Sequence, residues 1–284
     1  MATFFNQATL TYKNTSTTSN VVTGEIVQVL AAEKTAISPG YTIGERVTYV
    51  ISVVNSGTLP FTDLTVTDNL GAYEFGASAL VPLTYEEGSV RYYVNGVLQA
   101  DPTVVGTSPL VVSGIDIPAG GNAIIVYEAT ANQFAPLGDG AVIVNTATID
   151  GTQLSAPITA EETLGAASGA LLSITKALTP TEIPENGQLT YTFTIRNTGG
   201  TEVVATDNAV ITDVFDPSLN ITSVTYNGAA WTEGTNYTYD ETTGTFTTLE
   251  GQITVPAATY TQDPATGEWI VSPGVAIVTV TGTI

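Results

Sequence analysis

The chain has neither cysteine nor histidine among its 284 residues. Without cysteine it forms no disulfide and offers no thiol nucleophile, and without either residue it lacks the usual ligands of zinc, haem and iron–sulfur clusters. Catalytic dyads that use imidazole as the base are excluded as well. Most familiar enzyme mechanisms are removed in this way, so we expect a non-enzymatic protein with no metal and no other cofactor.

Basic residues are also scarce, because six Lys and Arg face 27 Asp and Glu, for a net charge of −21. Such a chain repels nucleic acid and anionic membranes. It has no run of the ~18 apolar residues that span a bilayer, and its first residues lack the basic and apolar regions of a signal peptide. We expect no nucleic-acid or membrane partner. The acidic, threonine-rich composition resembles that of bacterial surface proteins, although it also allows a cytosolic binding module.

Short runs of Val, Ile, Thr and Tyr alternate with polar residues and are separated by Gly, Pro, Asn and Asp, a pattern typical of all-β proteins. The pattern occurs twice. Lys34–Gly57 (KTAISPGYTIGERVTYVISVVNSG) matches Lys176–Gly199 (KALTPTEIPENGQLTYTFTIRNTG) at a constant offset of 142. About seven strands in each copy predict two tandem immunoglobulin-like Greek-key β-sandwiches, a first module over residues 27–165 and a second over 166–284.

The second copy lacks its last strand. The first module ends in AVIVNTATIDGTQLSAPITAEE (Ala141–Glu162), whereas the second stops at Ile284 without a counterpart. The missing sequence resembles the N-terminal residues 1–26, where Asn6–Leu10 (NQATL) matches Asn145–Ile149 (NTATI). We therefore interpret residues 1–26 as a donor-strand arm. Its predicted donor positions are Phe4, Ala8, Leu10 and Tyr12.

An open sandwich exposes apolar side chains and unpaired backbone groups, so something should fill it. An arm that reached its own second module would give a circularly permuted monomer. An arm that entered the next copy would give donor-strand complementation and a head-to-tail homopolymer. The short linker between the arm and the first module favours the second arrangement.

Period-two parity places three polar residue types toward the core of each module. One lysine, one aspartate and one asparagine share a face with apolar neighbours in each set: Lys34, Asp68 and Asn145 for the first module, and Lys176, Asp213 and the arm's Asn6 for the second. Burial of an unpaired charge costs several kcal/mol, so these groups should meet.

Two interpretations remain open for these residues. One is a buried salt bridge beside an amide. The other is an isopeptide bond, in which a neutral lysine attacks the asparagine amide while a protonated aspartate polarises the carbonyl and moves protons. The second interpretation predicts an intramolecular Lys34–Asn145 bond with Asp68 as catalyst. It also predicts an intermolecular Lys176–Asn6 bond with Asp213 as catalyst.

The pattern formed by Lys34, Gly44, Tyr49, Asn55, Gly57, Asp68, Pro118 and Asn145 resembles the bacterial surface repeat known as domain of unknown function 11. The resemblance covers nearly the whole chain, twice. It implies extracellular stalks, adhesins and filaments, and related Gram-positive pilin domains carry lysine–asparagine isopeptides with an acidic catalyst. The two-module plan is similar to that of appendage proteins on clostridial spores.

The sequence thus predicts a structural subunit of an extracellular fibre or appendage on a cell or spore surface, which polymerises with itself. The alternative is a monomeric adhesin or carbohydrate-binding module. Six aromatic residues of the second module could form a sugar-stacking platform: Tyr226, Trp231, Tyr237, Tyr239, Tyr260 and Trp269.

Overall fold

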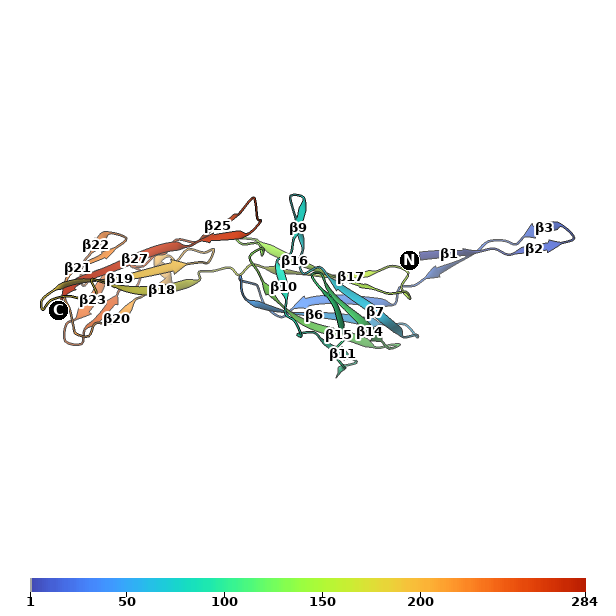
Figure 1. The fold of residues 1–284 in the computed structure, drawn as a ribbon, viewed down its shortest axis with the longest axis horizontal. Coiled ribbons are helices and arrows are strands. Elements are labelled where there is room, and N and C mark those ends of the chain that lie inside the picture. The colour runs from blue at the N-terminus through green and yellow to red at the C-terminus, as the bar shows by residue number, and fades with distance from the viewer. Residues whose placement is uncertain (1) are drawn as a thin grey trace. The chain divides into compact units, whose positions relative to one another are not determined.

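The computed structural model describes residues 2–284, which form β-strands and one short 3-10 helix, η1 (Ala205–Asp207). The chain divides into two compact units (Figure 1). Unit 1 contains the chain up to Pro136 together with Val142–Gly165, and unit 2 contains Leu137–Ala141 and Ala166–Ile284. None of the described helices is long and apolar enough to cross a membrane.

Unit 1 is built around two antiparallel sheets. The first has the order β12-β11-β15-β6-β5, with β10 also paired to β15. Its strands are β5 (Leu30–Ala36), β6 (Arg46–Asn55), β10 (Leu83–Tyr85), β11 (Arg91–Val94), β12 (Val97–Leu98) and β15 (Asn122–Ala131). The second sheet has the order β13-β14-β7-β16-β17. Its strands are β7 (Phe61–Asp68), β13 (Thr103–Thr107), β14 (Leu110–Ile117), β16 (Val142–Asp150) and β17 (Ile158–Gly165), and a separate hairpin joins β8 (Tyr73–Phe75) to β9 (Ser78–Leu80).

The two sheets enclose one apolar core. In β6 every second residue is buried, including Val47, Tyr49 and Ile51, and in β16 the same alternation buries Ile143 and Ile149. Successive side chains of a strand point to opposite faces, so such a period marks sheets with one face against a partner sheet. The predicted all-β, immunoglobulin-like sandwich fold is confirmed.

The N-terminal arm folds back on itself. Its strands are β1 (Ala2–Asn6), β2 (Thr9–Tyr12), β3 (Thr15–Thr18) and β4 (Val22–Ile26). Strand β1 pairs with β4 and β2 pairs with β3, so the arm is a narrow two-stranded ribbon (Figure 1). A two-residue turn closes it at Lys13 and Asn14, both with positive φ, which is the backbone of a hairpin turn that follows the strand twist. The sequence predicted an arm but not this hairpin.

Unit 2 repeats the plan with a smaller second sheet. Its first sheet has the order β18-β19-β27-β21-β22 and its second has β20-β24-β23. The strands are β18 (Leu172–Thr179), β19 (Gln188–Asn197), β20 (Thr212–Val214), β21 (Asn220–Tyr226), β22 (Ala229–Trp231), β23 (Tyr237–Asp240), β24 (Thr245–Thr248) and β27 (Gly274–Thr283), with a further hairpin of β25 (Thr259–Gln262) and β26 (Trp269–Ser272). The core of unit 2 includes Phe193, Phe215 and Phe246.

Matching hydrogen bonds show that the two units are structural repeats. The buried Asn55 side chain donates to the carbonyl of Pro118 at 3.0 Å, and the buried Asn197 side chain donates to that of Pro256 at 3.1 Å. In both units the same asparagine also accepts a hydrogen bond from the glycine two residues later. The two aligned asparagines therefore occupy equivalent places in the two units.

Candidate functional site

Lys34 and Asp68 form an ion pair in the core of unit 1. Lys34 lies on β5 and Asp68 ends β7, in the facing sheet, and Lys34 Nζ lies 2.6 Å from Asp68 Oδ2. Their side chains are 0% and 1% exposed. The other oxygen, Asp68 Oδ1, accepts a hydrogen bond from the backbone N–H of Leu70 at 3.0 Å. The pairing of the two charges offsets part of the cost of burying each of them.

Asn145 joins this pair through a tyrosine that sequence reasoning missed. The Tyr127 hydroxyl on β15 donates to Asp68 Oδ2 at 2.7 Å and accepts from Asn145 Nδ2 at 2.9 Å. Asn145 is fully buried on β16, two residues before Ala147, which pairs with Asp68. The sequence contained one signal for Tyr127, since it shares the inward face of its strand with Ile125 and Ala129.

The surroundings of Lys34 favour its neutral form. Burial lowers the pKa of Lys34 to about 8, although the nearby Asp68 carboxylate opposes this change. Lys34 Nζ also lies 4.9 Å from the ring centre of Tyr49, which stacks on Tyr127. Burial raises the pKa of Tyr127 well above its usual value, so its hydroxyl remains a hydrogen-bond donor at neutral pH.

The arrangement combines the parts that amide transfer needs. The site contains an amine with a lowered pKa, an acid hydrogen-bonded to that amine, and a side-chain amide held beside the acid. The carbonyl oxygen of Asn145 is buried without a hydrogen-bond partner among the described residues. A buried carbonyl without a donor is free to accept a hydrogen bond.

The equivalent pair of unit 2 is incomplete in a single chain. Lys176 Nζ contacts Asp213 Oδ2, but their side chains are 37% and 21% exposed. The ammonium lies over the rings of Tyr191, Phe193 and Phe215, which repeats the aromatic surroundings of Lys34. The prediction from parity that Lys176 is buried is wrong for the chain alone, because no strand within residues 2–284 covers this side of unit 2.

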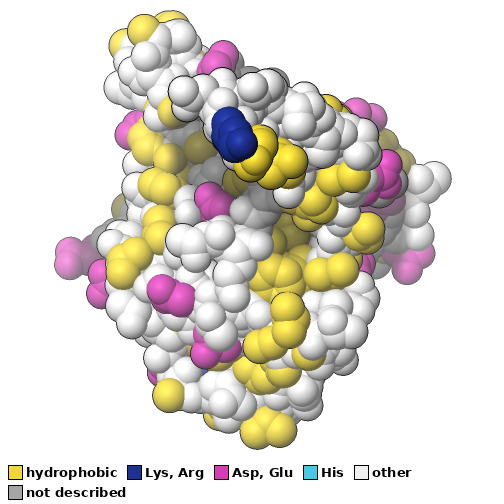
Figure 2. Space-filling view, turned by 90° about the vertical axis from the view of Figure 1, so that its right-hand side faces the viewer, with side chains coloured by type: hydrophobic (Ala, Val, Ile, Leu, Met, Phe, Trp, Pro, Cys, Tyr) yellow, Lys and Arg dark blue, Asp and Glu magenta, His cyan; other side chains and the backbone are white. Residues whose placement is uncertain are grey.

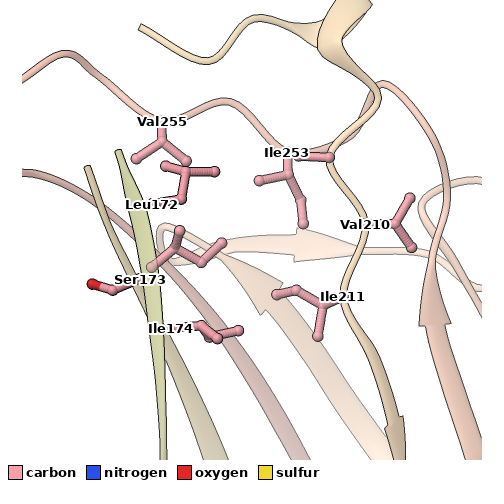
Figure 3. A pocket seen from close by; sticks show the side chains of 9 residues that line it. Leu172, Ser173, Ile174, Val210, Ile211, Ile253 and Val255 are labelled. Atoms are coloured by element: carbon pink, nitrogen blue, oxygen red, sulfur yellow. The ribbon is translucent and has the colours of Figure 1, made fainter. Parts of the chain in front are cut away.

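A slot marks the uncovered side. A cavity of about 180 Å³ lies between β18 and the residues before β20, and its lining is mostly aliphatic. Figure 3 shows Ile211 and Ile253 directed into this space from one side and Leu172 and Ile174 of β18 from the other, whereas Ser173 points away. Ile211 corresponds to Val66 of unit 1, which pairs with Ile149 of β16. The slot is therefore the place where unit 1 holds β16.

The arm carries the predicted donor residues and Asn6 in exposed positions. The side chains of Phe4, Leu10 and Tyr12 are exposed, as are those of Ala8 and Asn6. Asn6 lies on β1, opposite Val22 of β4.

Hydrophobic side chains also gather in several groups on the face of the molecule in Figure 2, where acidic side chains outnumber basic ones. Exposed apolar groups of this kind often mark contact surfaces.

Other candidate sites find less support. Tyr237 is buried against Phe246, and Tyr226 stacks on Trp231 with ring centres 5.0 Å apart. Three of the six aromatic residues proposed for sugar stacking thus pack against other rings. The described residues contain no cluster of three or more acidic, histidine or cysteine side chains that could hold a metal ion.

No family model and no curated protein matches the sequence, so the resemblance to domain of unknown function 11 stays a prediction. Among solved structures, the fold is similar to three pilins. The major pilin subunit BcpA of Bacillus cereus is 11% identical over 96% of this chain and 73% of that one, with a TM-score of 0.37. The major pilin GBS80 of Streptococcus agalactiae, as a C-terminal fragment, is 15% identical over 86% and 91%, with a TM-score of 0.32.

The third is the pilus backbone of Streptococcus pneumoniae, which is 12% identical over 86% of this chain, with a TM-score of 0.34. The match spans 55% of the length of that protein. Likenesses of this size leave the function to be inferred from the site itself.

Proposed function

We propose that this protein is the structural subunit of an extracellular fibre on a cell or spore surface, in which the N-terminal arm of one copy fills the open second unit of the next. The observation that carries the proposal is the free edge of β20. In unit 1 the matching strand β7 pairs with β14 on one side and β16 on the other, whereas β20 pairs only with β24 among the described residues. Strand addition to such an edge is a recurrent mode of protein association.

The repeat fixes the expected register of the added strand. In unit 1, Ala147 is opposite Asp68 and Ile149 is opposite Val66. The aligned residues place Ala8 of the arm opposite Asp213 and Leu10 opposite Ile211. Asn6 then has the position relative to Asp213 that Asn145 has relative to Asp68.

The attachment points of the arm favour donation to another copy. The arm joins unit 1 at the start of β5, where Leu30 pairs with Asn55, through the three residues 27–29. The chain leaves unit 1 at Gly165, whose carbonyl accepts from Tyr41, beyond the other end of β5. The three linker residues span at most about 11 Å, whereas the seven residues of β5 extend over about 23 Å. The base of the arm therefore stays near the start of β5, away from the place where the chain leaves unit 1. A donor and an acceptor at different places on one chain form an open filament.

Isopeptide bonds would make this fibre covalent. Neutral Nζ of the lysine attacks Cγ of the asparagine and a C–N bond forms. The aspartate carries one proton from Nζ to Nδ2, and the old C–N bond breaks to release ammonia. Within unit 1 the step joins Lys34 to Asn145 with Asp68, and between copies it joins Lys176 to Asn6 with Asp213. A secondary amide persists under conditions that unfold the sandwich.

The test compares the wild-type protein with a variant that lacks residues 1–26, by electron microscopy and size-exclusion chromatography. Wild-type protein should form fibres and the truncated chain should stay monomeric. Unit 1 should fold without the arm, because the arm strands pair only with one another in the described part of the chain. Fibres from the truncated chain would contradict strand donation, and a monomeric wild-type protein would support the adhesin alternative.

A second arm of the experiment addresses the covalent link. Wild-type fibres boiled in detergent should give a ladder of multimers, whereas Asn6→Ala fibres should assemble and then dissociate to monomer. Wild-type fibres that dissociate wholly to monomer would remove the intermolecular bond from the proposal and leave strand donation unaffected.

A further inference from the structure

Among the described residues, the second sheet of unit 2 has no counterparts of two strands of unit 1, β16 and β17. These two strands indicate the form of the segment that would complete unit 2. Unit 1 has β7 followed by β16 and β17 in its second sheet, whereas the sheet of unit 2 ends at β20. Strand β17 of unit 1 lies against β5, and the two strands share many contacts. In β5 the side chains of Leu30 and Lys34 are buried, whereas every residue but one in the corresponding β18 is exposed. A single added strand would replace β16 and leave β18 uncovered.

The arm already has the form of the missing pair. Strands β1 and β2 pair along their length with β4 and β3, as β16 pairs with β17. The ribbon continues through the interruption between β1 and β2, because the backbone N–H of Ser19 donates to the carbonyl of Ala8 at 2.9 Å and the backbone N–H of Ala8 donates to Ser19 Oγ at 3.0 Å. The arm is therefore one hairpin rather than a strand with a loose tail.

The hairpin has one face with most of its apolar residues and one polar face. Antiparallel partners lie on the same side of a ribbon, so the pairs Asn6–Val22 and Phe4–Gly24 place these residues on one face, with Ile26. Leu10 and Tyr12 follow Asn6 at even spacing and lie on this face with their partners Thr17 and Thr15, because the pairing shifts by one residue between β4 and β3. The Phe4 ring lies so close over Gly24 that a Cβ there would be 2.3 Å from it. The opposite face carries mostly Thr and Ser with Phe5 and Glu25: Thr3, Thr9, Thr11, Ser16, Thr18 and Thr23.

We propose that the arm enters the second unit of a neighbouring copy as an intact hairpin and supplies two strands. This inference rests on the proposed function. Strand β1–β2 adds to the edge of β20, and β3–β4 lies along β18, where β17 lies along β5 in unit 1. The face that carries Asn6 turns to the core, and Thr17 becomes buried opposite Leu10. The polar face becomes the outer surface of the completed sandwich.

Single aspartates on the two faces test the hairpin in the full-length chain. Thr17→Asp and Thr18→Asp add the same charge at adjacent positions, and both sites are exposed in the free chain, so both variants should fold as monomers. Thr17 is opposite Leu10, as the buried Ile158 is opposite Ile149 in unit 1. Thr17→Asp should form no fibres even at about tenfold the concentration at which wild-type protein assembles, because the carboxylate would be buried without a partner. Thr18→Asp should assemble as the wild type does.

Leu10→Asp separates failure of this inference from failure of strand donation. If Leu10→Asp blocks assembly and Thr17→Asp does not, one strand enters alone and the hairpin inference is overturned, while the proposed function stands. If Leu10→Asp fibres form, strand donation itself is overturned. Loss of fibres in Thr18→Asp would overturn the assignment of the two faces.

Discussion

The hydroxyl group of Tyr127 and the carboxylate of Asp68 are joined by a 2.7 Å hydrogen bond in the core of unit 1. The same carboxylate oxygen accepts from Lys34, and the same hydroxyl accepts from Asn145. Tyr127 thus fixes the positions of the acid and of the amide at once. The aligned residue of unit 2 is Val280, so any bond formed there proceeds without this tyrosine.

Removal of the Tyr127 hydroxyl should slow bond formation in unit 1. We expect Tyr127→Phe to keep the fold and to reduce the rate by roughly 10- to 100-fold, because the amide loses the group that positions it. The measurement is the intact mass at intervals after refolding. Tyr85→Phe is the matched control, since its buried hydroxyl has no hydrogen-bond partner among the described residues. Equal rates for the two variants would show that Tyr127 only fills space.

The isopeptide interpretation of unit 1 predicts a change of mass. Folded monomeric wild-type protein should be lighter than its sequence by one ammonia molecule, and Asn145→Ala should have its full sequence mass. Asp68→Ala should also have its full mass and be less stable by about 3–5 kcal/mol, since it leaves the Lys34 charge buried without a partner. An unmodified wild-type mass would leave the buried salt bridge as the correct interpretation.

The lowered pKa of Lys34 predicts how stability depends on pH when no bond forms. In Asn145→Ala the lysine keeps a folded-state pKa of about 8, whereas an unfolded lysine titrates near 10.4. Between these values the unfolded chain binds more protons, so the free energy of unfolding of unit 1 should rise from pH 8 to pH 10. Urea unfolding at both pH values measures this. Addition of Lys34→Met and Asp68→Asn to the same variant should abolish the rise, and a rise that persists would assign it to another group.

The register of the donated strand can be tested by engineered disulfides, because the chain has no cysteine of its own. Thr67 and Thr148 are opposite each other in unit 1, and the aligned positions are Thr212 and Thr9. Fibres of Thr9→Cys/Thr212→Cys should form cross-linked multimers on non-reducing gels, since directly opposite residues allow a disulfide. Thr67→Cys/Thr148→Cys provides the positive control. Stronger cross-linking with Thr11→Cys in place of Thr9→Cys would show a register shifted by two residues.

The sequence by itself determined the all-β class, the two repeats and the pairing of Lys34 with Asp68. The all-β class follows from the period of two residues, which reflects local backbone geometry. The repeats follow from the constant offset between the two copies, and the ion pair follows from the cost of burying an unpaired charge. The same reasoning placed Asn145 in the core, and the structure links it to Asp68 through Tyr127.

Only the tertiary structure decided which groups meet across the two sheets. Tyr127 reaches Asp68 and Asn145 because of how β15 in one sheet faces β7 and β16 in the other, and parity gives the direction of a side chain but not its partner on a facing sheet. The sequence did not predict that the arm is a hairpin, because the Lys13–Asn14 turn has no glycine to signal it. The exposure of Lys176 likewise depends on which strands are present beside it, because burial is a property of the neighbours a residue has in space rather than of its place in the chain.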